Sequence, residues 1–493
     1  MLGDGLNDKA QRMEKSDIRM QLQGLHVLVV GLGKTGQAAV RFFLQHDARV
    51  SVSETAPKSS IAPEVITWLA ENNIVCETGG HSLDLFTAAD LIFVSPGIPL
   101  TIEPLAAARR RNIPITGELA VAAAFMRTPV IAVTGTNGKT TVTTLLGDIF
   151  QAASKKVFVG GNIGTPLLEY LAGVQDADFV VAEISSFQLD TGGSHKGLPF
   201  KTAILLNITP DHLERYASFA AYVDSKFTIF AAQGPDDYAV LNADDAEIMK
   251  RRNLWPASQK YFFGEKLADL AGASIQGSAI HLKNSSSASL PDNMHGEVYE
   301  LDATALKNPP NLQNAAAAIL GARLMGCRQQ DINKGLSSFK PLSHRMTLVA
   351  EIGGVSYIDD SKATNVGAVY SALAAQQQPV ILIAGGRDKG GDYSVLAEPV
   401  RNKVRHMLLI GEAKDTMARA FMAFTNVEVF DTLQEAVSRA ARLAVPGDTV
   451  LLSPACASFD MFSSYAERGD VFRKSVLGLL RNHAGSPKEA SVH

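Results

Sequence analysis

The feature that most constrains the fold of this chain is a glycine-rich loop joining an apolar segment to an apolar helical stretch. The loop reads TGTNGKTT over residues 134–141, and the segment before it reads PVIAV. In this shortened Walker-type pattern, GxxGK[ST], backbone N–H groups surround phosphate oxygens, Lys139 reaches the terminal phosphates and the Thr140 hydroxyl binds Mg²⁺. Because the pattern lies between a predicted strand and a predicted helix, it predicts an α/β domain that binds ATP.

A second glycine loop lies near the N-terminus and has more than one interpretation. Gly31, Gly33 and Gly36 follow the apolar run 26–30, and Glu54 lies 18 residues beyond Gly36. This arrangement fits the fingerprint of NAD(P)-binding domains. These glycines let the backbone approach a diphosphate, which NAD(P) shares with other nucleotides, so the pattern does not select NAD(P). A tight turn that binds no ligand is a third interpretation.

Short apolar runs alternate with helical stretches along the whole chain, which predicts parallel sheets covered by helices. The runs that we assign to strands form three consecutive series, 26–30, 49–53 and 91–94, then 129–134, 179–184 and 202–207, then 355–358, 380–384, 406–410 and 448–453. A chain of 493 residues has the length of about three domains. We therefore predict three α/β units joined in series.

Composition and charge argue against several classes of partner. The 46 lysines and arginines are balanced by 50 aspartates and glutamates, whereas a nucleic-acid-binding chain needs a basic surface. No apolar run approaches the ~20 residues that cross a bilayer. Residues 1–22 are polar and carry both charge signs, unlike a signal peptide. We expect a cytoplasmic protein with neither nucleic-acid nor membrane partners.

Polar side chains follow two further strands of the central series, at the sheet edge where open α/β sheets bind ligands. Glu183 follows the run FVVA, and His212 follows the run 202–207. A carboxylate and an imidazole beside a phosphate loop indicate metal and phosphate chemistry. Lys226 lies 14 residues beyond His212, on a predicted helix at 219–232. Asp211 and Glu214 are more simply interpreted as surface residues.

The ordered set of motifs resembles the Mur ligase family, the ATP-dependent amide-forming enzymes of peptidoglycan synthesis. The segments that carry the resemblance are GLGKTG at 31–36, SPGI at 95–98, TGTNGKTT at 134–141, GGNIG at 160–164, EISSFQL at 183–189, NITPDHLERY at 207–216, NLQN at 311–314, HRM at 344–346, DDSKATN at 359–365, GGRDKG at 385–390 and SPACASFDMFSSYAERG at 453–469. They are most similar to the members that add D-glutamate to UDP-N-acetylmuramoyl-L-alanine. The Asp-Asn-Pro-Arg signature of the diaminopimelate-adding members is absent.

Three other classes explain the motifs less well. A ligase like folylpolyglutamate synthase, from the same superfamily, would not need the 31–36 loop in an N-terminal domain of its own. An NAD-dependent dehydrogenase would leave the Lys139 loop unexplained, and a motor protein would not need the segments 359–365 and 453–458. The resemblance therefore implies that the first loop binds a UDP-sugar and that no NAD is used.

The resemblance implies a polar extension at 1–22 and three α/β domains: a Rossmann-like UDP-binding domain at 23–118, a central P-loop ATPase domain at 119–341 and a Rossmann-like amino-acid-binding domain at 342–493. It also implies a monomer, ATP as co-substrate and a pair of Mg²⁺ ions. The residues implied for ATP are Gly135, Thr136, Asn137, Gly138, Lys139, Thr140, Thr141, Asn311, Asn314, Arg345 and Asp360. Those implied for the UDP substrate are Gly33, Lys34, Thr35, Gly36, Glu54, Thr55, Ser95, Gly97, Asn162 and Ser185.

The same resemblance implies the catalytic and acceptor residues. Those implied for D-glutamate are Lys362, Thr364, Lys389, Ser458, Phe459 and Tyr465. The implied catalytic residues are Lys139, Glu183, His212 and Lys226, and the implied metal ligands are Thr140, Glu183, His212 and a carbamylated Lys226. Three positions depart from the family pattern: Pro310 replaces the usual histidine of the adenine segment, Glu214 replaces the more usual aspartate after His212, and Ala56 stands where an arginine often supports uracil.

Overall fold

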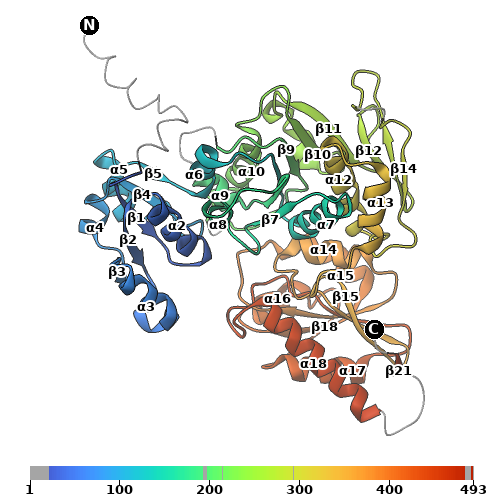
Figure 1. Ribbon diagram of the computed structural model, residues 1–493. Coiled ribbons are helices and arrows are strands. Elements are labelled where there is room, and N and C mark those ends of the chain that lie inside the picture. The colour runs from blue at the N-terminus through green and yellow to red at the C-terminus, as the bar shows by residue number, and fades with distance from the viewer. Residues whose placement is uncertain (1–21, 192–196, 214, 292–293, 484–489, 492–493) are drawn as a thin grey trace.

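The computed structural model describes residues 22–191, 197–213, 215–291, 294–483 and 490–491, which fold into three units, each built on one β-sheet (Figure 1). The predicted mixed α/β fold is confirmed. Of the predicted N-terminal extension, only Leu22 lies within the described residues, and it is buried in the core. Every helix in these ranges is too short or too polar to span a bilayer.

The N-terminal sheet is parallel and has the strand order β3-β2-β1-β4-β5. Along β1, Val27 and Val29 enter one hydrophobic cluster while Leu28 and Val30 enter another, so the strand is buried on both faces. The elements of this unit are β1 (His26–Val30), α2 (Lys34–Gln45), β2 (Arg49–Glu54), α3 (Pro63–Glu71), β3 (Val75–Thr78), α4 (Leu83–Thr87), β4 (Leu91–Val94), α5 (Glu103–Arg110) and β5 (Ile115–Thr116).

The central sheet has the order β14-β13-β12-β11-β10-β9-β6-β8-β7. Its strands are β6 (Val130–Thr134), β7 (Val157–Gly161), β8 (Phe179–Glu183), β9 (Thr202–Leu205), β10 (Tyr238–Asn242), β11 (Gln259–Gly264), β12 (Gly272–Gln276), β13 (Ala279–Lys283) and β14 (Val298–Glu300). The ladder is parallel from β7 to β12, whereas β13 pairs antiparallel with both β12 and β14. The sequence predicted a parallel sheet and did not predict this antiparallel edge.

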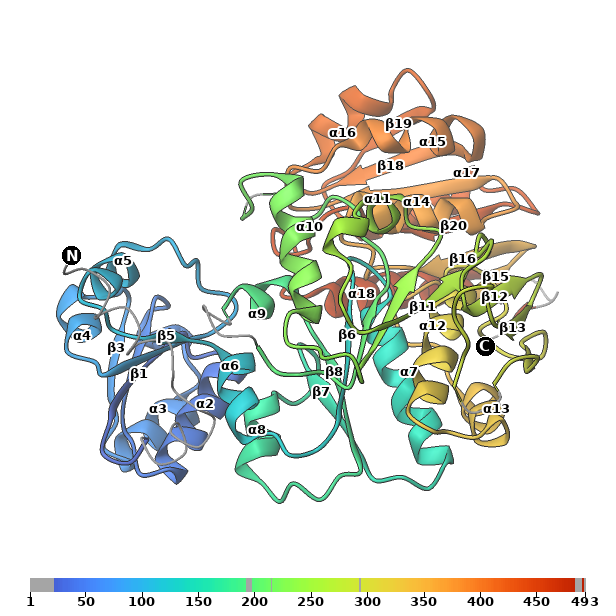
Figure 2. The same ribbon diagram turned by 90° about the horizontal axis from the view of Figure 1, so that it is seen from above.

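Helices cover both faces of the central sheet (Figure 2). Ile131 and Val133 of β6 pack on the cluster that contains α7, α12 and α13, while Val130 and Ala132 pack on the opposite cluster. The helices are α6 (Glu118–Phe125), α7 (Lys139–Ala152), α8 (Leu167–Ala172), α9 (Ser186–Asp190), α10 (Phe219–Phe227), α11 (Ala246–Lys250), α12 (Asn311–Leu324) and α13 (Gln329–Ser338). The predicted helix 219–232 ends earlier, because a 3₁₀ turn follows at Thr228–Phe230.

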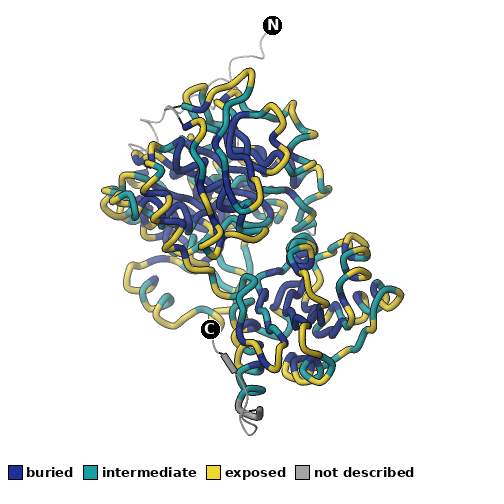
Figure 3. The backbone as a smooth tube through the Cα atoms, turned by 90° about the vertical axis from the view of Figure 1, so that its right-hand side faces the viewer, coloured by how far each residue is buried: buried dark blue, intermediate teal, exposed yellow. Residues whose placement is uncertain are grey.

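The N-terminal and central units share one hydrophobic cluster. Helix α2 packs on α8, and the ring of Phe42 on α2 meets the ring of Phe125 on α6 edge to face, with centroids 5.0 Å apart. Figure 3 shows the buried backbone inside each unit and the exposed backbone around it. The two units are thus joined by packed side chains as well as by the chain.

The C-terminal sheet has the order β19-β18-β17-β20-β16-β15-β21, in which β15 pairs antiparallel with β16 and β21 and the other pairs are parallel. Its elements are β15 (Thr347–Ile352), β16 (Val355–Asp359), α14 (Val366–Ala375), β17 (Val380–Gly385), α15 (Ala397–Lys403), β18 (Val404–Ile410), α16 (Lys414–Phe421), β19 (Asn426–Val429), α17 (Leu433–Leu443), β20 (Thr449–Leu452), α18 (Tyr465–His483) and β21 (Ala490–Ser491). Helix α14 faces the central unit, so the ends of both sheets approach the same region (Figure 1).

Candidate active site

The predicted phosphate loop connects β6 to the N-terminus of α7. Gly138 has φ 86°, and a Cβ atom there would lie 2.4 Å from Asn314 Oδ1, so the loop requires glycine at this position. Lys139 Nζ folds back over the loop and donates to the carbonyl oxygens of Gly135 and Thr136, both at 2.8 Å. Burial lowers the pKa of Lys139, and nearby Glu183 opposes that effect. The loop therefore holds its lysine inside the site rather than in solvent.

A second lysine is buried against the same loop. Lys226 on α10 is only 1% exposed, and its Nζ donates to the Gly135 carbonyl oxygen at 2.9 Å. The ammonium nitrogen lies 4.6 Å from the centre of the Tyr222 ring. Burial lowers the pKa of Lys226 far below its usual range, and the nearby Lys139 lowers it further. Both effects favour the neutral amine, which is the form that reacts with CO₂.

Glu183 ends β8 and is 2% exposed. Its Oε1 accepts a hydrogen bond from Asn162 Nδ2 at 2.8 Å, while no donor among the described residues contacts the buried Oε2. A buried carboxylate oxygen without a partner costs free energy unless a cation or donor meets it. The Glu183 carboxylate therefore has a free oxygen suited to a hard cation such as Mg²⁺.

The described residues hold no cluster of three His, Cys, Asp or Glu side chains that could bind a metal. The predicted ligand set contains only two such side chains, Glu183 and His212. Its other members are the Thr140 hydroxyl and a carbamate on Lys226, and phosphate oxygens of a bound nucleotide would supply the remaining ligands. The donor chemistry of the site therefore fits a Mg²⁺ ion that binds together with a nucleotide.

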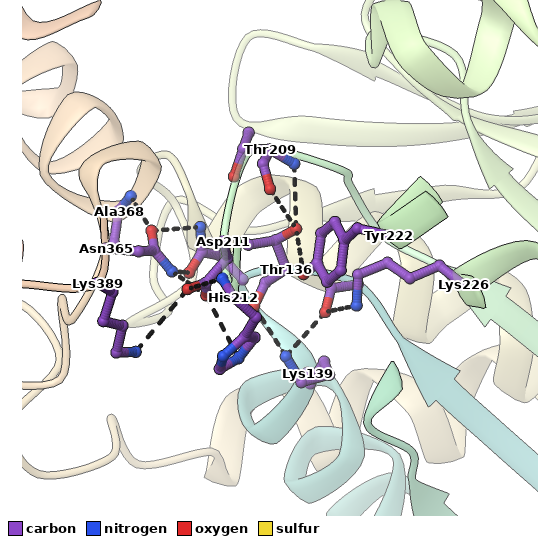
Figure 4. A network of polar contacts seen from close by, with 12 residues as sticks. Thr136, Lys139, Thr209, Asp211, His212, Tyr222, Lys226, Asn365, Ala368 and Lys389 are labelled. Carbon is purple, nitrogen blue, oxygen red and sulfur yellow. Dashed lines mark hydrogen bonds and ion pairs between the residues drawn. The ribbon is translucent and has the colours of Figure 1, made fainter. Parts of the chain in front are cut away.

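Asp211 joins the central unit to the C-terminal unit (Figure 4). Its Oδ2 accepts from Asn365 Nδ2 at 3.0 Å, and its Oδ1 lies 3.8 Å from Lys389 Nζ. Oδ1 also accepts from the backbone N–H of His212, which has φ 57°. The Asp211 side chain is 8% exposed, so the interpretation of Asp211 as a surface residue is wrong: Asn365, the N-cap of α14, and Lys389 contact it. Glu214 lies outside the described residues.

A pocket lies between the central and C-terminal units, beside the phosphate loop. Of the residues predicted for ATP, those lining it are Asn137, Gly138, Thr141, Asn311, Asn314, Arg345 and Asp360. Its wall also contains residues to which the sequence assigned no role, Thr209 and Met346 inside quoted motifs and Asn242 and Phe263 outside them. These come from the ends of β10 and β11 and from loops that only the folded chain brings beside the nucleotide pocket.

The carboxyl group of Asp360, which lines this pocket, has a strongly shifted pKa. Burial raises the pKa of its carboxyl from 3.8 to about 7, although Ser453 Oγ and the N–H of Met346 donate to it. The folded state therefore holds a proton that the unfolded chain releases, and stability falls as pH rises from about 4 to about 7. Asp360→Asn keeps an acceptor for the Met346 N–H but cannot lose a proton. The free energy of unfolding of the variant minus that of wild type should therefore be larger at pH 8 than at pH 5, by roughly 2–4 kcal/mol.

Urea unfolding of both proteins at the two pH values measures this difference. Asp415→Asn, at an exposed position on α16, is the matched control for replacing an aspartate by asparagine. An Asp360→Asn stability difference that is the same at both pH values would contradict the assigned pKa.

The first glycine loop lines a second pocket, together with the loop after β7. Of the residues predicted for the UDP substrate, those lining it are Gly33, Lys34, Thr35, Glu54, Ser95, Gly97 and Asn162. Gly36, Thr55 and Ser185 do not line it. A Cβ at Gly36 would lie 1.9 Å from the Gly31 carbonyl oxygen, the Thr55 hydroxyl donates to Glu54, and the Ser185 hydroxyl caps α9.

The residues predicted for D-glutamate do not form one cluster. Thr364 and Lys389 line a small pocket beside Asp211 and Asn365. Lys362 lines the nucleotide pocket, its Nζ lies 3.9 Å from the centre of the Tyr465 ring, and burial lowers its pKa to about 8. On the loop after β20, Ser458 is buried whereas Phe459 is 63% exposed. The structure therefore distributes these residues over the small pocket, the wall of the nucleotide pocket and the loop after β20.

Comparisons with known proteins agree with this arrangement. Family models match three stretches, the Mur ligase MurD-like N-terminal domain over 25–117, the Mur ligase middle domain over 133–322 and the Mur ligase glutamate ligase domain over 344–456. The UDP-N-acetylmuramoylalanine--D-glutamate ligase of Syntrophotalea carbinolica is 42% identical over 462 residues, 94% of this chain and 99% of that protein. The enzyme of the same name from Geotalea uraniireducens is 44% identical over 475 residues, 94% and 100%. The chain belongs to the Mur ligase family.

Solved Mur ligase structures share the fold at low sequence identity. A pseudomurein peptide ligase type C from Methanothermus fervidus has a TM-score of 0.57 at 19% identity, covering 92% of this chain and 100% of that chain. The UDP-N-acetylmuramate-alanine ligase of Thermotoga maritima has a TM-score of 0.54 at 18% identity, covering 94% and 100%. At such identities the likeness concerns the fold alone.

Several residues of this Mur ligase site had no role in the sequence interpretation. Asn207 accepts from the Asn137 N–H at 2.8 Å, and the Tyr222 hydroxyl lies 3.1 Å from Thr136 Oγ1, so both brace the phosphate loop. Asn365 caps α14 and contacts Asn137 across the unit boundary. Asn207 and Asn365 lie inside the motifs 207–216 and 359–365. Their positions were visible in the sequence, but their partners were not.

Proposed function

We propose that this protein joins D-glutamate to UDP-N-acetylmuramoyl-L-alanine in an ATP-dependent reaction that releases ADP and phosphate. The observation that carries the proposal is the position of the phosphate loop among three pockets. Asn137 lines the nucleotide pocket, Asn162 lines the pocket of the first glycine loop while holding Glu183, and Asp211 lines the pocket that also contains Thr364 and Lys389. A ternary amide ligase needs its three substrates to meet at such a place.

The chemistry follows from the poor reactivity of a carboxylate. Its oxygen is too poor a leaving group for an amine to displace, so the γ-phosphoryl group of ATP is first transferred to it, giving an acyl phosphate. The amine of D-glutamate attacks the acyl carbon, a tetrahedral intermediate forms, and phosphate leaves as the amide forms. Lys139 supplies positive charge beside the phosphates, and most of the rate enhancement comes from positioning and electrostatics.

Thr140, Glu183, His212 and a carbamylated Lys226 would hold the Mg²⁺ ions. When bound, these ions neutralise the negative charge that gathers on the phosphate oxygens. The neutral Lys226 amine adds to CO₂ and releases a proton, which leaves an anionic carbamate on the side chain. Two observations support this assignment: Oε2 of Glu183 has no hydrogen-bond partner among the described residues, and burial lowers the pKa of Lys226.

Recognition of the two remaining substrates uses the other pockets. The loop residues Lys34 and Thr35 would bind the UDP moiety, and Lys389 and Thr364 would bind a carboxylate of D-glutamate. Lys362, Ser458, Phe459 and Tyr465 would complete the acceptor site. We further propose a cytoplasmic monomer whose functional units span 23–118, 119–341 and 342–493.

Phosphate release tests the proposed function directly. Purified protein with ATP and Mg²⁺ should release phosphate only when UDP-N-acetylmuramoyl-L-alanine and D-glutamate are both present. L-Glutamate, diaminopimelate and a folate substrate with glutamate serve as alternatives. Comparable turnover with the folate pair would assign the chain to the folylpolyglutamate class, and turnover with diaminopimelate would move it to another Mur ligase.

A further inference from the structure

One arginine of the central unit bridges the site and the N-terminal unit. The guanidinium of Arg215 donates to the carbonyl oxygens of Gly97 at 3.3 Å and Ile98 at 3.1 Å. Both carbonyls belong to the loop 95–98, which lines the pocket assigned to the UDP moiety. Arg215 therefore holds the backbone of that loop from outside the pocket.

The same guanidinium stacks on an aromatic ring of the active site. Its central carbon lies 3.9 Å from the centre of the Phe187 ring, on α9. The His212 ring also packs on Phe187, with centroids 4.7 Å apart. Phe187 is thus shared by Arg215 and by the proposed metal ligand His212, which are three residues apart in one turn where the Arg215 N–H donates to the His212 carbonyl oxygen.

The loop 95–98 is in turn fixed to the first glycine loop. Ser95 Oγ donates to the Gly31 carbonyl oxygen at 2.9 Å, and a Cβ at Gly31 would lie 3.1 Å from the Ile98 side chain. A ligand that orders the Gly31 loop must therefore restrain the carbonyls that Arg215 holds. The contacts run without interruption from the UDP pocket to the His212 ring.

We propose that Arg215 is a positioning residue that couples the loop 95–98 of the UDP pocket to the ring of His212 through Phe187. The coupling rests on the proposed function in one respect, the assignment of UDP to that pocket. Lysine cannot replace arginine here, because it lacks the planar group that spans two carbonyls while stacking on a ring. Occupancy of the UDP pocket would then order the turn that carries His212, before ATP or D-glutamate binds.

Hydrogen–deuterium exchange with UDP alone as the probe tests the coupling. UDP lacks the muramoyl group of the whole substrate, so any protection near His212 has to come through the protein. In wild type, UDP should slow exchange in both 95–98 and 207–213. In Arg215→Lys, it should still slow exchange in 95–98 but no longer in 207–213. Equal protection of 207–213 in the variant would overturn the coupling, while absence of UDP binding to wild type would overturn the pocket assignment itself.

Steady-state kinetics provide a second readout with a matched control. At saturating substrates, Arg215→Lys should lower kcat by about tenfold, since a misplaced His212 cannot be corrected by substrate concentration. Arg41→Lys is the control, because Arg41 also joins the N-terminal unit to the central unit, through Glu169 at 3.3 Å, and also lies over an aromatic ring, that of Trp68. It should behave as wild type. An equal loss in both variants would indicate a general effect of unit packing and would contradict the proposal.

A double-mutant cycle tests the role of the shared ring. Phe187→Leu should lower kcat by a similar factor, and the double variant with Arg215→Lys should lose little more than either single variant, because both act on one contact. Losses that multiply would mean that Arg215 and Phe187 act independently, which would overturn the path through the ring.

Discussion

Replacement of Lys226 by alanine is expected to lower kcat by about a hundredfold or more. The lysine is buried against the Gly135 carbonyl, and burial together with Lys139 lowers its pKa, so its amine is poised to take up CO₂ rather than to act as a cation. Alanine removes both the carbamate and its place in the metal site. Initial rates of phosphate release, with both organic substrates saturating, measure the loss.

Chemical rescue separates the carbamate from a purely structural role. Formate or acetate should restore part of the activity of Lys226→Ala by binding where the carbamate carboxylate lay, whereas chloride should not. Lys226→Arg keeps a positive charge but cannot be carbamylated, so it should remain inactive. Lys156→Ala, at an exposed lysine paired with Asp176, is the control and should have normal turnover. Near-normal turnover of Lys226→Arg would show that Lys226 contacts phosphate as a cation instead.

Lys139→Ala is expected to abolish detectable ligation, a loss of about a thousandfold or more, while leaving UDP-substrate affinity within a few-fold of wild type. Lys139 is held by the carbonyls of Gly135 and Thr136, beside the nucleotide pocket and outside the pocket of the first glycine loop. Calorimetric titration with UDP-N-acetylmuramoyl-L-alanine measures the affinity, and phosphate release measures the ligation.

Lys34→Ala provides the reciprocal experiment, because Lys34 lines the pocket of the first glycine loop. It should weaken UDP-substrate binding and leave ATP binding unchanged. If Lys139→Ala also destroyed binding of the UDP substrate, the assignment of the two pockets to different substrates would be wrong.

The sequence predicted the units of this protein because their signals are local. The loop 134–141 specifies a strand–loop–helix unit by itself, since glycine adopts the left-handed backbone at Gly138 without a clashing Cβ and a helix N-terminus directs its N–H groups at phosphate. A buried parallel strand can also be predicted from its own residues, as the run 26–30 shows, because both of its faces are apolar. The order of motifs along the chain was sufficient to indicate the family.

Tertiary structure alone decided which side chains meet. Asp211 was interpreted as a surface residue, because its partners Asn365 and Lys389 lie more than a hundred residues away in the chain. Strands β13 and β14 were missed for a related reason: their antiparallel pairing at a sheet edge depends on neighbours and not on their own short sequences. The lowered pKa of Lys226 likewise arises from burial and from the charge of the nearby Lys139. Lys226 is buried and close to Lys139 only once α10 has packed against the phosphate loop.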